Sequence, residues 1–181
     1  TPLALGLLIN GSYYEFNANT PQEINSTDPI AVYQYIITQN CDNVSGDPEM
    51  VLINSTEQTL KDITVVSAER TLTPPNTNIT SHFLNIIIKN TGTALSSLRI
   101  DGGIPVATFN PVGLTQYVYA SINVTGTTTA FNPSHRIISD SGFVAIAYGF
   151  GNVESYGYNA GTYVKDPYQQ IGVSTEYGIE P

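Results

Sequence analysis

Glycine, proline, asparagine and aspartate interrupt this chain so regularly that its apolar residues occur only in short runs. Short apolar or alternating runs bounded by turn-forming residues are typical of β-strands rather than of helices. Twelve segments have this pattern: residues 3–9, 13–16, 30–37, 50–53, 63–66, 83–89, 98–100, 105–109, 115–124, 136–139, 143–150 and 158–164. Many short strands separated by turns predict an all-β protein, built as an antiparallel β-sandwich.

Two segments suggest more specific local structure. Residues 55–62 are the one candidate for a helix, because Ser55 could cap its start and Gln58 could bond back to it. Such a helix would last only one or two turns. Asp101, Gly102 and Gly103 lie between two predicted strands, and this sequence predicts a tight β-hairpin.

Two stretches 113 residues apart have similar patterns. Residues 24–35 align without a gap on residues 137–148, and each copy ends in an apolar strand that closes with a tyrosine, Tyr35 or Tyr148. Duplication would give two related β lobes, residues 1–70 and residues 81–181, and an incomplete first lobe is left open. Chance similarity is the alternative. The Pro-, Thr- and Asn-rich residues 71–80 would connect the lobes, or would form a long loop inside one sandwich.

Charge and composition exclude several classes of function. Six Lys and Arg residues against fifteen Asp and Glu residues give a net charge of −9. Such a surface repels phosphate, so a general role in binding nucleic acid or anionic membranes is excluded. No apolar run approaches the roughly 20 residues that cross a bilayer, and membrane insertion is not expected. Few lysines with 21 Thr, 16 Asn and 12 Tyr are typical of an extracellular protein. The chain starts at Thr1 without a leader-like segment, and we expect a processed part of a larger secreted protein.

The residue types that carry catalysis occur without the spacing that such chemistry needs. His82, His135 and Cys41 form no zinc-ligand pattern, and no Gly-x-Ser-x-Gly nucleophile motif is present. Cys41, the single cysteine, reads as a small buried residue, with a free thiol or a bridge to another part of a longer chain as alternatives. The oxygen-rich residues 42–49 suit a turn better than a calcium site. We therefore predict no catalytic residues, no cofactor, no metal site and no enzymatic activity.

The end of the chain is rich in glycine and tyrosine. Gly149, Gly151, Gly157 and Gly161 predict a tightly packed strand–turn–strand corner, because such a density of glycine weakens a strand unless the backbone needs it. The alternative makes the same loop a ligand-contacting edge. Five tyrosines lie in or after this corner: Tyr156, Tyr158, Tyr163, Tyr168 and Tyr177. They suit either a half-buried sheet face or recognition of a ligand.

Three stretches in order resemble a known family. They are residues 29–35 with residues 46–53, Glu57 and Gln58; the apolar residues 83–88 with Asp101 and Gly102; and residues 135–139 with the Gly- and Tyr-rich residues 142–158 and Gly161. This order resembles the N-terminal domain of IgGFc-binding protein. Relatives of that domain occur in secreted mucin-like animal proteins and in large cell-surface proteins of Bacteroidota-type bacteria. The sequence of residues 150–156 is more similar to that of the bacterial relatives. The resemblance spans residues 9–164.

The resemblance implies a secreted or surface-displayed all-β module of a longer multidomain protein, with binding as its role and no catalytic residues. Binding of immunoglobulin Fc is not carried over, because it belongs to one animal member. We predict an extracellular module for adhesion or protein interaction. Its ligand, a protein or a glycan, and its ligand-binding residues are not identified by the sequence. The alternative is a carbohydrate-binding module of a secreted glycan-degrading enzyme, for which exposed coplanar aromatic residues in a groove are expected.

Overall fold

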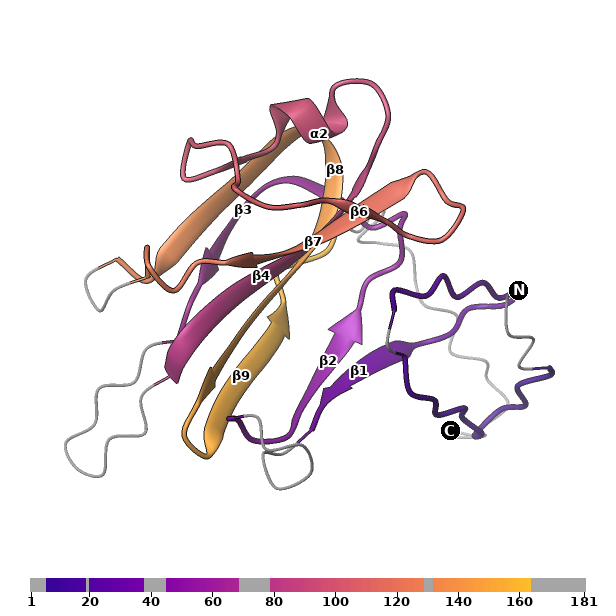
Figure 1. Cartoon of the computed structure of the whole chain (residues 1–181). Helices are drawn as coiled ribbons and strands as arrows, with labels where there is room; N and C mark the ends of the chain where they lie inside the picture. The colour runs from indigo at the N-terminus through magenta and orange to yellow at the C-terminus, as the bar shows by residue number, and fades with distance from the viewer. Residues whose placement is uncertain (1–5, 19, 38–44, 69–78, 129–131, 164–181) are drawn as a thin grey trace, which may run out of the picture.

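The computed structural model describes residues 6–18, 20–37, 45–68, 79–128 and 132–163 (Figure 1). In chain order the elements are β1 (Val32–Ile36), β2 (Glu49–Ile53), β3 (Leu60–Val66), β4 (Ile79–Lys89), α2 (Ala94–Ser97), β5 (Arg99–Ile100), β6 (Asn110–Pro111), β7 (Tyr117–Asn123), β8 (Ser134–Gly151) and β9 (Glu154–Asn159). Every strand pair formed by the described residues is antiparallel. The predicted all-β sandwich is confirmed.

The larger sheet is organised around the 18-residue strand β8. The first part of β8 pairs with β3 and β5, and its second part pairs with β4 and β9. β7 and β6 extend the sheet beyond β4, which gives the order β3-β8-β4-β7-β6. β8 therefore joins the two predicted strands at residues 136–139 and 143–150 into one.

The polar residues at the junction of those two predicted strands do not form a turn, because residues of α2 supply the hydrogen-bond partners of their side chains. The Ser139 hydroxyl donates to the Ala94 carbonyl over 2.9 Å, and the Ser97 hydroxyl donates to the Asp140 carboxylate over 2.7 Å. The pairing of β3 with β8 shifts register between Leu60 and Asp62, opposite this stretch. Gly142 is needed there, since the Thr59 side chain occupies the space that a Cβ atom would take. Tertiary hydrogen bonds thus override the local turn propensity.

The main core lies on the inner face of the larger sheet. Alternate residues of β4, β7 and β8 point into it, as the period of two in a strand requires. Its buried members are Val65, Leu84, Ile86, Ile88, Ala94, Leu98, Val118, Ala120, Ile122, Val124, Ile137, Phe143, Ala145 and Ala147. Tyr156 and Tyr158 of β9 pack against this cluster, so both belong to the half-buried sheet face.

A second, smaller layer covers part of the outer face of the same sheet. It consists of β1 and β2, which pair only with each other among the described strands. Val51 is buried against β9, because a Cβ atom on Gly157 would lie only 2.9 Å from the Val51 Cγ2 atom. The Asn159 side chain also donates to the Leu52 carbonyl over 3.1 Å. The small layer is therefore held on the β9 side of the sheet, as Figure 1 shows.

Several local predictions are wrong. Residues 6–9, 13–16 and 105–109 are not strands, and no helix forms at residues 55–62, where β3 begins at Leu60. One capping contact of the expected helix is nevertheless present, since the Ser55 backbone N–H donates to the Gln58 side-chain carbonyl over 3.4 Å, and the Gln58 backbone N–H donates to the Ser55 carbonyl over 3.1 Å. They close a single turn before the strand. The turn at Asp101–Gly103 does form, with the N–H groups of Ile100 and Gly103 each donating to the other residue's carbonyl over 2.9 Å.

The expected duplication is also wrong. Tyr35 lies on the two-stranded sheet and points to solvent, whereas Tyr148 is half-buried on the central strand of the larger sheet. The two tyrosines are therefore not in equivalent strands. β3, from the predicted first lobe, pairs with β8 from the predicted second lobe. The predicted connection, residues 71–80, lies outside the described residues up to Asn78, so the seam itself stays a prediction.

Candidate functional site

The outward face of the two-stranded sheet carries four exposed large apolar side chains in the part of the chain that the structure describes. Tyr33 and Tyr35 of β1 lie opposite Leu52 and Met50 of β2 in the antiparallel register. Their exposed fractions are 47%, 64%, 48% and 55% in that order. We call these four residues the β1–β2 patch. Cross-strand partners lie side by side on one face of a sheet, so the four side chains form one continuous surface.

The local sequence explains why the two-stranded sheet is apolar on both of its faces. β1 reads Val-Tyr-Gln-Tyr-Ile and β2 reads Glu-Met-Val-Leu-Ile, so apolar residues occupy nearly every position rather than every second one. Ile36 and Val51 point inward and pack above Gly157. The alternate residues then point outward, and in the described part of the chain no element covers them. A strand that is apolar on both faces is normally buried on both.

A groove lies beside β1, where the small layer ends and the larger sheet continues. It has a volume of about 120 Å³ and is lined by Gln34, Ile36, Val51, Asn85, Ile146, Tyr148 and Phe150. We call it the edge groove. Its walls come from β1, β2, β4 and β8, so its shape depends on the packing of the two layers. Four of its seven lining side chains are apolar, and two amides and one phenol supply hydrogen-bonding groups.

The floor of the edge groove continues into a layer of aromatic rings. Phe83 and Tyr148 are stacked with their centroids 5.2 Å apart, and Phe150 meets Tyr148 edge to face at 5.6 Å. The Tyr148 hydroxyl lies 2.8 Å from the Ser121 hydroxyl and donates to the Asn85 side chain over 3.2 Å. Burial raises the pKa of Tyr148 above its usual value. The floor is therefore rigid, uncharged and satisfied in its hydrogen bonds.

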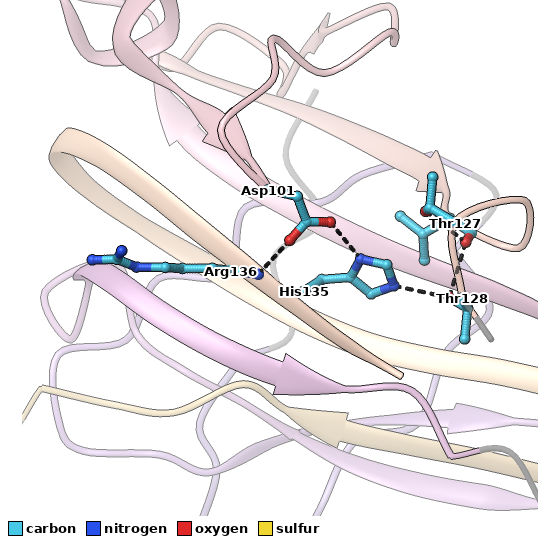
Figure 2. Close-up of polar contacts among 6 residues, drawn as sticks. Asp101, Thr127, Thr128, His135 and Arg136 are labelled. Carbon is cyan, nitrogen blue, oxygen red and sulfur yellow. Dashed lines mark hydrogen bonds and ion pairs between the residues drawn. The ribbon is translucent and has the colours of Figure 1, made fainter. Parts of the chain in front are cut away.

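The two histidines lie in separate polar networks. His135 is fully buried, with its Nδ1 atom 2.8 Å from the Asp101 carboxylate and its Nε2 atom 2.8 Å from the Thr128 hydroxyl. Figure 2 shows the Asp101 carboxylate between the His135 ring and the Arg136 backbone, whose N–H donates to it over 2.8 Å. His82 is also buried, and its Nδ1 atom lies 3.1 Å from the Tyr156 hydroxyl.

The order Thr128–His135–Asp101 is that of a nucleophile, a base and an orienting carboxylate. Other features favour a structural role. The Thr128 hydroxyl also donates to the Val124 carbonyl over 2.9 Å, and neither described pocket is lined by any of the three residues. The network joins the turn after β5, the turn after β7 and the start of β8. It holds three segments together that are distant in sequence.

A wider depression of about 370 Å³ lies between β3 and β8. Three of its four charged groups are hydrogen-bonded: Arg136 donates to both oxygens of Asp62 over 2.9 and 2.6 Å, and Asp140 accepts from Thr93 and Ser97. The fourth, Lys61, lies close enough to Asp140 to favour its ionised form. These hydrogen bonds hold the pKa values of Asp62 and Asp140 below their usual range. Groups that are already paired leave little for a ligand to bind.

The other predicted features are placed as follows. The glycine-rich corner is the β8–β9 hairpin, in which Val153 has a φ of 51°. The strand–turn–strand prediction is confirmed, although β9 resumes at Glu154 rather than near Tyr158. Tyr168, Tyr177, Cys41, Asp42 and Asn43 lie outside the described residues. Within the part that the structure describes, no three His, Cys, Asp or Glu residues lie together as a metal site would require, and no helix is long and apolar enough to cross a membrane.

Sequence reasoning did not single out the β1–β2 patch. Both strands were predicted, but two apolar faces in sequence indicate a buried strand and not an exposed one. One feature of the sequence could have indicated the exposed face. The flanking residues 17–29 are mostly polar and contain no apolar segment that could cover it. The edge groove could not be found from sequence, because its walls come from four strands that are distant along the chain.

The fold and these surfaces define a β-sandwich that presents an exposed apolar sheet face. The chain belongs to the IgGFc binding protein family, since the model of that family matches residues 4–149. Membership points to a protein-binding module of the extracellular or cell-surface kind. No curated protein and no solved structure matches the chain.

Proposed function

We propose that this chain is a non-catalytic protein-binding module that works outside the cell, in adhesion or protein interaction, as part of a larger secreted protein. Its contact surface is the β1–β2 patch. The proposal is supported by family membership and by the exposure of four adjacent large apolar side chains on a regular sheet. Contiguous apolar surface is costly to leave in water, and on soluble proteins it commonly marks an interaction site.

The chemistry of the patch favours a protein over a glycan. Tyrosine combines a large apolar face with a polar tip, and Met50 is a flexible side chain that adapts to differently shaped partners. Glycan sites instead combine coplanar rings with polar side chains that bond the sugar hydroxyls. In the aromatic floor, Phe83 and Tyr148 stack on each other with an interplanar angle of 17°, so each covers one face of the other. A carbohydrate-binding role is the second candidate that the same experiment tests.

The test is binding of the full chain to immobilised extracellular proteins and to a glycan array. The IgG Fc fragment is the first protein probe, because the family is named after it, and fibronectin, collagen and mucin are the others. The variant pair is Tyr35→Ser and Tyr13→Ser. Tyr13 is 81% exposed and lies outside the patch, so it is the matched control.

We expect binding to at least one protein, at least about tenfold weaker for Tyr35→Ser and unchanged for Tyr13→Ser, as expected for loss of an aromatic contact. Equal effects of the two substitutions would show that the patch is not the contact surface. Binding to glycans alone would replace the proposal with the carbohydrate-binding alternative. Binding to neither would contradict both.

A further inference from the structure

The outer layer of the sandwich is incomplete. Two strands, β1 and β2, cover the β9 and β8 side of the larger sheet, while the outer face of β4 and β7 carries half-buried residues without a covering strand among those described. The half-buried side chains on that outer face include Phe83, Ile87, Tyr117 and Tyr119. The edge groove marks the boundary between the covered and the uncovered parts.

The boundary is also a free strand edge. β1 hydrogen-bonds to β2 on one side, and its other side has no backbone partner within the described residues. In an antiparallel pair, every second residue of an edge strand points its N–H and C=O groups away from the pair. β1 therefore presents backbone donors and acceptors beside the edge groove, which its residues Gln34 and Ile36 line. Unpaired edges of this kind accept an additional strand.

The charge of the N-terminal part of the chain indicates what kind of strand would bind at the free edge of β1. Residues 1–60 contain seven carboxylates and no Lys, Arg or His. Asp47 and Glu49 lie at the end of the hairpin nearest Ile36, and the pKa of Glu49 is raised by burial and by repulsion from Asp47. A cationic partner would relieve this repulsion, whereas an acidic segment or a second copy of this acidic chain would add to it.

We propose that the free edge of β1 binds a basic, extended peptide segment of a partner protein as an additional antiparallel or parallel strand. This inference rests on the proposed function and names the form of the partner. Every second side chain of the added strand would enter the edge groove over Tyr148 and Asn85. The side chains that enter the groove are apolar. The other alternate side chains would lie beside Tyr33 and Tyr35 on the outward face, where Lys or Arg can stack on the tyrosine rings.

The probe is the peptide acetyl-Lys-Val-Lys-Ile-Lys-Val-Lys-amide, titrated into the full chain and followed by amide NMR. Two further peptides carry N-methyl groups, one on the Lys positions and one on the Val and Ile positions. An added strand uses only one of its own edges, so only one of the two N-methylated peptides should bind more weakly, by at least about tenfold. Within Val32–Ile36, the amides that point away from β2 should become protected from exchange when the unmodified peptide binds.

The charge component has its own controls. A peptide with Glu in place of Lys should bind at least about tenfold more weakly. The double variant Asp47→Asn, Glu49→Gln should lose affinity for the basic peptide, while Glu23→Gln, at an exposed site outside both strands, should not. Equal binding of the acidic and basic peptides would contradict the proposed chemistry of the partner.

Three other results would overturn strand addition. Equal binding of both N-methylated peptides would mean that no backbone edge is used. Protection, in the free chain, of the β1 amides that point away from β2 would mean that the chain fills its own edge, and protection of these amides that grows with protein concentration would mean that a second copy does. If a partner protein binds through the β1–β2 patch while the β1 amides that point away from β2 stay unprotected, strand addition fails and the proposed function stands. If the peptide binds but no protein of the panel does, the proposed function fails instead.

Discussion

At the scale of single residues, the His135 side chain links the start of β8 to both the turn after β5 and the turn after β7. Both ring nitrogens have partners at 2.8 Å, and one of these partners, Asp101, sits at a positive φ of 52° in the turn after β5. Non-glycine residues rarely adopt this conformation, and Asp and Asn are among those that do so most readily. The buried ring therefore fixes a turn that is strained for most other residues.

Replacement of His135 by Ala should lower the free energy of unfolding by about 2–4 kcal/mol, because it removes a buried ring and leaves Thr128 and Asp101 without that partner. Asp101→Asn should cost less, since the Oδ1 acceptor for the Arg136 N–H and tolerance of positive φ are both kept. Urea unfolding of the three proteins measures the difference. A loss below about 0.5 kcal/mol for His135→Ala would show that the network contributes little.

At the scale of elements, tertiary contacts decide where strands begin and end. The short apolar segments that became β1, β2, β4 and β7 were predictable as strands from sequence, because their neighbours in space agree with their local pattern. β8 was not, because Ser139 and Asp140 are turn-forming in sequence but bond to α2 in the fold. The exposed face of β1 was not predictable either, since nothing in a run of apolar residues shows which of its two faces will be covered.

β9 makes the stability of the fold sensitive to alkaline pH. The Tyr158 hydroxyl donates to the Val66 carbonyl over 2.6 Å and accepts from the Val66 N–H over 2.7 Å. Burial raises the pKa of Tyr158, and it also raises the pKa of Tyr156 and Tyr148. In the unfolded chain a tyrosine side chain has a pKa of about 10. A raised pKa in the fold means that this contribution to stability is full below that pH and is lost as pH rises through the folded-state pKa.

We expect the free energy of unfolding to fall more steeply with pH above about 10 in the native chain than in Tyr158→Phe, which has no hydroxyl to ionise. At pH 8 the variant should be less stable, because the two Val66 hydrogen bonds are lost. Urea unfolding at a series of pH values from neutral to alkaline measures both effects. Parallel curves for the two proteins would contradict a raised pKa at Tyr158.

At the scale of the whole molecule, the two layers of the sandwich differ in their surface chemistry. The larger sheet has a closed core, and its charged groups around β3 and β8 are paired with one another. The small layer of β1 and β2 carries exposed apolar side chains in the part of the chain that has no basic residue. A stable support that presents one adaptable, acidic, apolar surface is the arrangement that a binding module needs.

The most direct test is amide hydrogen exchange of the full chain with and without a protein that binds it, beginning with the IgG Fc fragment. Bound-state protection should be concentrated in Val32–Ile36 and Glu49–Ile53, with the His135 network unchanged. Protection concentrated instead around the depression formed by Lys61, Asp62 and Asp140 would contradict the assignment of the β1–β2 layer as the binding surface.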